Sequence, residues 1–268
     1  MGVTLRLARP PALRLDLRGL TPLLLNPMVA ADIEKLPVGL GRRLLPLAEF
    51  FDVRMGDSDA LVFEGDLARC DRIGWRLGAG CIVAEGSVGD HAGSQMTAGK
   101  LLIRGNAGVL AGSEMAGGEL TVDGSVGDFA AASLPGSMDG MRGGTFIVRG
   151  NAGERFGDRM RRGTACVFGD AGDFLASRMV AGSIAVGGCV GSHVGYGMRR
   201  GSLVFAGAPP FVAATFVPAL AGAPVFWQLL ARDIARHGGP FAELPQRGFR
   251  RHLGDLAAAG KGEIIVVD

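Results

Sequence analysis

Lysine is nearly missing from this chain. Lys35, Lys100 and Lys261 are the lysines among its 28 lysine and arginine residues, an imbalance typical of a GC-rich genome. The formal net charge of +2 is close to neutral, which argues against general nucleic-acid binding. No apolar run is long enough to cross a membrane, and no charged N-terminal region with an apolar stretch and a cleavage site indicates secretion. We therefore expect a cytoplasmic protein that binds neither nucleic acid nor membrane.

Motifs for metals, disulfides and catalysis are also lacking. The cysteines are Cys70, Cys81, Cys166 and Cys189. They form no Cys-x-x-Cys motif and no metal-ligand spacing, so we expect reduced thiols and no metal site. A serine adjacent to its histidine, as at Ser192 and His193, is not the arrangement of a catalytic triad. The Gly-x-x-Gly steps lack the Gly-Lys-Ser/Thr of a phosphate loop. The sequence predicts no catalytic residue.

Glycine, in contrast, is abundant and periodic. The chain has 45 glycines without a Gly-X-Y triplet, and 48% hydrophobic residues, which excludes both collagen and a disordered chain. A glycine recurs every nineteen residues, with one slip of seven, at Gly86, Gly105, Gly124, Gly150, Gly169, Gly188 and Gly207. Ten residues after five of these positions stand Met96, Met115, Met160, Met179 and Met198, and Met141 follows Gly124 by seventeen because the slip falls between them. Such a period indicates one supersecondary unit stacked on copies of itself.

Within each repeat, numbered from its glycine as position zero, the apolar positions are spaced as in short strands. Positions −4 and −2 are apolar, as in Leu101 and Ile103, and this alternation predicts a strand with both side chains on one face. Positions +2, +6 and +10 are also apolar, so the methionines are expected to fill the core. Glycines at 0, +3 and often +7 and +13 allow turns with positive φ and close backbone approach. Nineteen residues leave no room for a helix. We predict an all-β-dominated chain, a right-handed parallel β-helix with coils of about nineteen residues.

The repeat divides the chain into three expected regions: an N-terminal segment 1–60, a repeat domain 61–207 and a C-terminal cap 208–268. The seven-residue slip marks an insertion near Ser133–Arg142, which should project as a loop from one face. The elements expected outside the repeat are strands at Val3–Leu7, Leu13–Leu17 and Glu263–Val267, a partly helical Ile33–Phe51, and helices at Val225–His237 and Phe249–Ala258. These flanks should cover the open ends of the stack.

Two outward-facing features are not needed for folding. Position −3 should face away from the core, yet it is largely apolar: Val62, Val83, Leu102, Thr121, Ile147, Cys166, Ala185 and Val204. Either the flanking segments cover this column, or another protein does. The second feature is an arginine column next to the methionines, with Arg178 nearby, formed by Arg142, Arg161, Arg162, Arg199 and Arg200. These arginines are either solvated and paired with local acids, or form a surface for an acidic protein or a polyanionic tail.

The motif Gly-x-x-Gly-x-x-x-Gly-x-x-Met-x-x-Gly, as in Gly86–Gly99 and Gly188–Gly201, resembles the glycine-rich β-helix domain at the end of the glutamate synthase large chain. Together with Leu13–Pro22, Glu34–Val38 and 142–153, it makes most of the chain resemble the glycine-rich subunit of formylmethanofuran dehydrogenase, the one designated C. The related bacterial formyltransferase/hydrolase complex has the same type of subunit. A hexapeptide-repeat acyltransferase is excluded, because nineteen is not a multiple of six.

The resemblance implies a noncatalytic structural subunit that binds no cofactor itself and contacts the catalytic subunits of a hetero-oligomeric complex. In the bacterial version, the complex transfers formyl from formyl-tetrahydromethanopterin to a methanofuran-type cofactor and releases formate. The arginine-rich, lysine-poor composition favours this version. The alternatives are the equivalent subunit of a molybdenum or tungsten formylmethanofuran dehydrogenase, and a glutamate-synthase-like β-helix domain protein. Methanofuran-type cofactors carry glutamate-rich tails, so the resemblance makes a polyglutamate tail a candidate ligand of the arginines.

Overall fold

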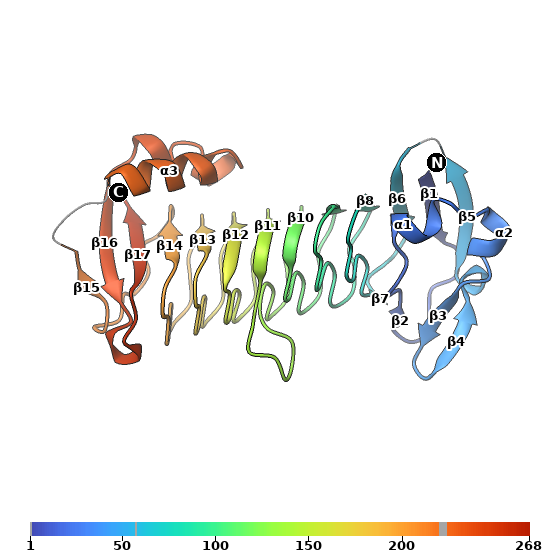
Figure 1. Ribbon diagram of the computed structural model, residues 1–268, viewed down its shortest axis with the longest axis horizontal. Helices are drawn as coiled ribbons and strands as arrows, with labels where there is room; N and C mark the ends of the chain where they lie inside the picture. The colour runs from blue at the N-terminus through green and yellow to red at the C-terminus, as the bar shows by residue number, and fades with distance from the viewer. Residues whose placement is uncertain (1, 57, 220–223) are drawn as a thin grey trace.

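One long stack of strands forms the body of the protein. The computed structural model describes residues 2–56, 58–219 and 224–268. Within these ranges a thirteen-stranded sheet has the order β15-β16-β17-β14-β13-β12-β11-β10-β9-β8-β6-β1-β5, and a four-stranded sheet has the order β4-β3-β2-β7. The N-terminal elements lie at one end of the stack and the C-terminal elements at the other (Figure 1). The chain is therefore dominated by β-structure, as the sequence predicts.

The central strands come from successive repeats. They are β6 (Ala60–Glu64), β8 (Cys81–Ala84), β9 (Lys100–Ile103), β10 (Ala116–Val122), β11 (Arg142–Val148), β12 (Arg162–Val167), β13 (Ser183–Val186) and β14 (Ser202–Phe205). Each pairs in parallel with the next, and equivalent positions face each other, as Leu101 faces Leu120. The register shifts near the start of the strands between β10 and β11, and again between β11 and β12. Residues before β11 form the long loop that leaves the body (Figure 1).

The core lies between this ladder of strands and a second column of parallel contacts. Isolated bridges join position +2 of one repeat to the next, from Leu67–Val88 through to Ala171–Val190. All six repeat methionines are fully buried with the alternating strand residues and the +6 residues. The predicted inward positions −4, −2, +6 and +10 are confirmed. Period-two alternation and a fixed repeat length place the same side chain at the same depth in every repeat.

Both ends of the ladder are closed by non-repeat strands. At the N-terminal end, β1 (Gly2–Leu7) pairs in parallel with β6 and antiparallel with β5 (Phe51–Gly56). At the other end, β17 (Gly262–Val267) pairs in parallel with β14 and antiparallel with β16 (Phe249–Gly254), which also pairs with β15 (Val217–Pro218). The parallel strand continues the stack, and the antiparallel strand covers the edge that would otherwise be free.

The remaining elements are short, apart from one helix. They are β2 (Leu15–Asp16), β3 (Pro37–Leu40), β4 (Arg43–Pro46), β7 (Cys70–Asp71), α1 (Pro22–Leu25), α2 (Ala30–Ile33), α3 (Pro224–Ala235) and 3-10 turns at Leu47–Glu49, Gly239–Phe241, Leu244–Gln246 and Leu256–Ala258. No helix in the described ranges is long and apolar enough to cross a membrane.

One predicted helix outside the repeat is wrong, while the helix at Val225–His237 is confirmed as α3. The segment Phe249–Ala258 forms strand β16 and a 3-10 turn, because β17 offers it a backbone edge and the Arg251 guanidinium lies 2.7 Å from Glu263 of β17. The segment Ile33–Phe51, expected to be partly helical, is mainly the β3–β4 hairpin followed by a 3-10 turn. Local periodicity cannot show that a neighbouring strand edge is available to a segment.

The repeat glycines meet two structural demands. At Gly188 φ is not positive, but a Cβ would lie 2.3 Å from the Asp170 side-chain oxygen Oδ1 and 2.7 Å from the Gly169 backbone of the preceding repeat. Asp170 Oδ1 in turn accepts a hydrogen bond from the Cys189 backbone N–H at 2.7 Å. Gly201, at position +13, has φ of +102°, and a Cβ there would also lie 2.8 Å from the Gly182 carbonyl oxygen. Position zero thus requires glycine for close approach, and position +13 requires it for backbone conformation as well.

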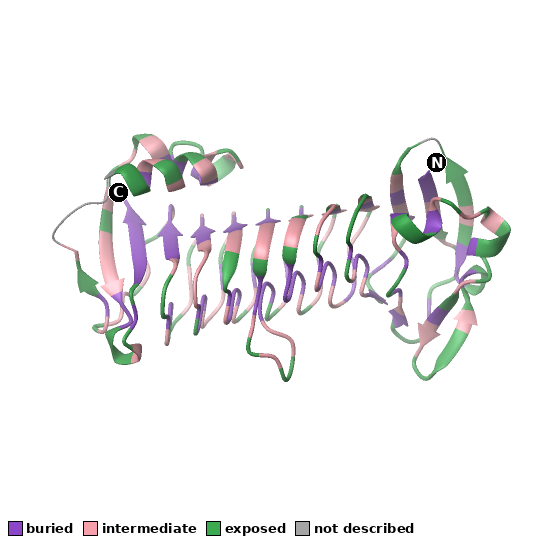
Figure 2. Cartoon of the chain, in the orientation of Figure 1, coloured by how far each residue is buried: buried purple, intermediate pink, exposed green. Residues whose placement is uncertain are grey.

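Helix α3 covers half of the outward apolar column (Figure 2). Ile147, Cys166, Ala185 and Val204 are buried in a second hydrophobic cluster, separate from the main core, with three residues of the helix. Those helix residues are Trp227, Ala231 and Ile234. The other members of the column are partly buried: Val62, Val83, Leu102 and Thr121. The expectation of an internal cover is therefore confirmed for the C-terminal half of the column only.

Candidate functional site

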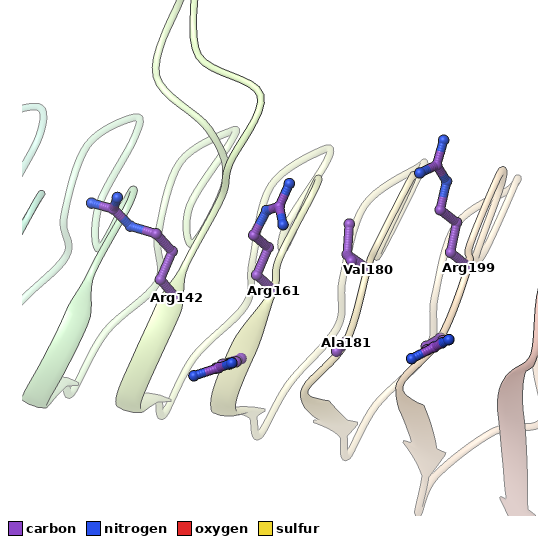
Figure 3. A pocket seen from close by; sticks show the side chains of 7 residues that line it. Arg142, Arg161, Val180, Ala181 and Arg199 are labelled. Carbon is purple, nitrogen blue, oxygen red and sulfur yellow. The ribbon is translucent and has the colours of Figure 1, made fainter.

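The five predicted arginines line one hollow of about 560 Å³ on the C-terminal half of the stack. The lining residues are Arg142, Arg161, Arg162, Arg199 and Arg200, with Val180 and Ala181. Arg142, Arg161 and Arg199 extend on the same side of successive turns, with Val180 between the last two (Figure 3). All five arginines are solvent-exposed. The group is called the arginine row below.

Buried methionines fix the backbone of the arginine row. The backbone N–H of Arg161 donates to the Met141 carbonyl at 2.7 Å, and that of Arg199 donates to the Met179 carbonyl at 2.8 Å. The methionine side chain points into the core, so the residue after it faces outward. Because the repeat between them carries Val180 and Ala181, the row has a gap that two short side chains fill.

Acidic groups neutralise little of the arginine row. Arg161 forms an ion pair with Asp139 of the insertion loop, and Arg142 contacts the Glu114 carbonyl at 3.5 Å. In the described part of the chain, the side chains of Arg162, Arg199 and Arg200 have no hydrogen bond or ion pair. No acidic side chain lines the hollow. Like charges held together without counter-charges favour an anionic ligand, and guanidinium groups bind carboxylates well.

Arg178, expected near the arginine row, does not line its hollow, although Val180, two residues later, does. Its guanidinium donates to both oxygens of buried Asp158, at 2.8 and 2.9 Å. It lines a different hollow, below the insertion loop and beside Phe129. Asp158 lies in the preceding repeat, next to Arg159, the residue equivalent to Arg178. The sequence does not show which of the two arginines Asp158 contacts.

A second arginine cluster, which the sequence does not indicate, lies near the N-terminal end. Arg14 binds Asp71 at 2.7 Å and Asp90 at 2.8 Å, and Arg72 binds Asp16 at 3.0 Å. Burial raises the pKa of Asp16, but hydrogen bonds from Arg18 and the charge of Arg72 lower it by more, so its pKa lies below the ordinary value. These arginines therefore serve mainly as partners of nearby carboxylates. Arg14 and Asp71 are 57 residues apart along the chain, and Asp90 is farther still, so no local pattern reveals the cluster.

The cysteines differ sharply in environment, and this gives a prediction. Burial raises the pKa of Cys70 and of Cys166 to about 12, whereas Cys189 is exposed. At pH 8 about one in 10⁴ of the buried thiols is ionised, so alkylation by iodoacetamide should be at least ~100-fold slower there than at Cys189. Peptide mass spectrometry of the native chain measures the rates. Equal rates in the native chain, or a persistent difference after unfolding in urea, would contradict this.

No group of three or more potential metal ligands occurs among the described residues, and all four cysteines are free thiols. The lining of the hollow includes no nucleophile, acid or base other than guanidinium groups. The arrangement can bind an anion by charge and by hydrogen bonds. It holds no group that would take up or release a proton near neutral pH.

Comparisons with known proteins give a consistent result. No protein-family model matches the chain. Over 86 residues it is 44% identical to the Fhc subunit designated C in the formyltransferase/hydrolase complex of Methylorubrum extorquens, and this match spans 32% of each chain. A chain in the crystal structure of the formyltransferase/hydrolase complex (FhcABCD) from the same organism, in complex with methylofuran, matches with a TM-score of 0.91 and 42% identity. That similarity covers 98% of both chains.

Proposed function

The chain belongs to the family of this Fhc subunit of formyltransferase/hydrolase complexes, and we propose that it is the noncatalytic structural subunit of such a complex. The observation that carries this proposal is the similarity over 98% of both chains at 42% identity. The assembled complex would transfer formyl from formyl-tetrahydromethanopterin to a methanofuran-type cofactor and then release formate. The catalytic groups would come from the other subunits.

In this proposal the repeat region winds as a right-handed parallel β-helix. The parallel ladder of the central strands and the second column of parallel bridges at position +2 support it, since both advance by one repeat at each step. Such a winding gives a rigid rod whose long faces are available to several subunits at once.

The arginine row would hold the anionic tail of the methanofuran-type cofactor. Three observations support this: five guanidinium groups line one hollow, no carboxylate lines it, and three of the five have no side-chain partner in the described part of the chain. A polyglutamate tail has carboxylates spaced along a flexible chain, which matches arginines spaced along the rod. The tail would stay anchored here while its other end reaches the active sites of the partner subunits.

Purification of the native complex through an affinity tag on this chain tests the proposed function. We expect the catalytic subunits to copurify, and the complex to convert formyl-tetrahydromethanopterin to formate. Oxidation of formylmethanofuran with an electron acceptor, instead of formyl transfer, would assign the chain to a molybdenum or tungsten dehydrogenase. Recovery of the chain alone would contradict both assignments.

A further inference from the structure

The outward apolar column is continuous in register but is covered over half its length. Val62, Val83, Leu102 and Thr121 pair in sequence, and Thr121 pairs with Ile147, the first residue beneath the C-terminal cover. Between α3 and the N-terminal elements, no helix or strand of the described residues lies over β8, β9 and β10 (Figure 1). The uncovered members lie on strands β6, β8, β9 and β10.

The covered half shows what kind of element fits this face. Trp227, Ala231 and Ile234 of α3 are spaced by four and three residues, so they form one stripe of the helix. They share a cluster with Cys166, Ala185 and Val204, which belong to three successive strands. The face therefore accepts a helix laid across the strands, with one apolar side chain for about each strand.

The uncovered half has the length for a second helix of the same size. The axes of four strands at a spacing of about 4.8 Å span roughly 14 Å, and half a spacing on each side brings the width of this face to about 19 Å. Twelve helical residues, the length of α3, span about 18 Å. A three-turn helix in line with α3 would fill the gap.

The charged residues beside the apolar column indicate which charges a binding partner of this face should carry. Lys100 lies 3.5 Å from Glu119, and Arg104 lies 3.1 Å from Asp123, so these pairs neutralise the edge over β9 and β10. Over β6 and β8, Glu64 and Glu85 have no side-chain hydrogen bond or ion pair in the described ranges. The two unpaired carboxylates at this end call for basic residues on the occupant.

We propose that an amphipathic helix of about twelve residues from a partner subunit docks across β6, β8, β9 and β10. Its apolar residues at i, i+4 and i+7 cover the stripe from Val62 to Thr121, and Lys or Arg residues at one end approach Glu64 and Glu85. The inference rests on the proposed function in one respect only, that this chain works within a complex. It concerns a different face from the arginine row.

Photo-crosslinking in the assembled complex tests the shape of the occupant. A diazirine amino acid placed separately at Val83 and at Thr121 samples points two strands apart, about 9.6 Å. On a helix lying across the strands, the two crosslinked partner residues should be about six or seven positions apart, whereas on an extended segment they should be about three apart. Spacing near three, crosslinks to a second copy of this chain, or no crosslink in an assembled complex would each overturn the proposal.

A variant pair separates failure of this inference from failure of the proposed function. Leu102→Glu places a charge in the centre of the stripe and should lower recovery of the partner subunits at least ~10-fold. Val109→Glu, at an exposed valine of position +4 outside the sheet, is the matched control and should leave recovery unchanged. If the wild-type chain recovers no partners, the proposed function fails. If it does and Leu102→Glu recovers them equally well, only the docking site is wrong.

Discussion

A variant with Arg161, Arg162, Arg199 and Arg200 replaced by serine is expected to bind a polyglutamylated methanofuran-type cofactor roughly 100-fold more weakly than the wild type. Each arginine in contact with a carboxylate contributes about 0.7 kcal/mol, so four contribute nearly 3 kcal/mol, or two orders of magnitude in Kd. Affinity should also become less sensitive to salt, because screening acts on fewer charge pairs. Titration of the assembled complex at two ionic strengths measures both effects.

The matched control replaces Arg6, Arg42, Arg43 and Arg54 with serine. These arginines are exposed and lie in the N-terminal part of the chain, so the net charge falls equally without any change in the arginine row. Unfolding free energies of both variants should stay within about 0.5 kcal/mol of the wild type, since surface substitutions of this kind have small effects. Unchanged affinity and salt dependence in the arginine-row variant, or an equal loss of affinity in the control variant, would contradict the proposal that the arginine row binds the tail.

Replacing Gly188 with alanine is expected to lower the free energy of unfolding by about 3 kcal/mol, because the new methyl group meets atoms that have no room to move. Its Cβ would lie 2.3 Å from Asp170 Oδ1 and 2.7 Å from the backbone of Gly169. Displacing Asp170 also breaks its hydrogen bond from the Cys189 N–H, a loss of about 1 kcal/mol within that total. The backbone of Gly169 is fixed in turn by the neighbouring repeats, so the strain cannot relax locally.

The control for this substitution is Gly78→Ala. At Gly78 φ is not in the left-handed region and a Cβ would meet only Thr97 Oγ1, at 3.6 Å, an ordinary contact. This variant should be as stable as the wild type or slightly more stable, since alanine restricts the unfolded chain. Urea unfolding followed by circular dichroism measures both. A Gly188→Ala chain that unfolds at the wild-type urea concentration would show that the repeats are less tightly stacked than the structure indicates.

The structure of the repeat region was predictable because the same residue types recur at the same positions in every repeat. The alternation at Leu101 and Ile103, and the methionine at +10, place the same groups inward in every copy, and the structure buries them as expected. Several turn residues had no such signal. His91, Phe129 and Phe174 adopt positive φ without being glycine, because their backbone N–H groups bond to the adjacent repeat. This conformation comes from stacking, which outweighs the local preference of those residues.

The flanks were less predictable, since their structure depends on distant edges. Phe249–Gly254 has a composition that suits a helix equally well, and it becomes a strand because β17 lies beside it. Arg178 directly precedes a repeat methionine, whereas the arginine row follows the methionines, and it binds Asp158. The partner that determines the structure is β17 in the first case and Asp158 in the second. Each is distant along the chain, and the sequence does not show which of several possible partners will form the contact.

By itself, the sequence determined the nineteen-residue period, the inward side chains and the placement of arginines directly after buried methionines. These follow from contacts between equivalent positions of adjacent repeats, which a strict period specifies. Only the tertiary structure decided which strands close the two ends of the stack, which half of the apolar column α3 covers, and which arginines stay without an acid. Those outcomes depend on long-range packing of non-repeated segments, for which each contact competes with alternatives of similar free energy.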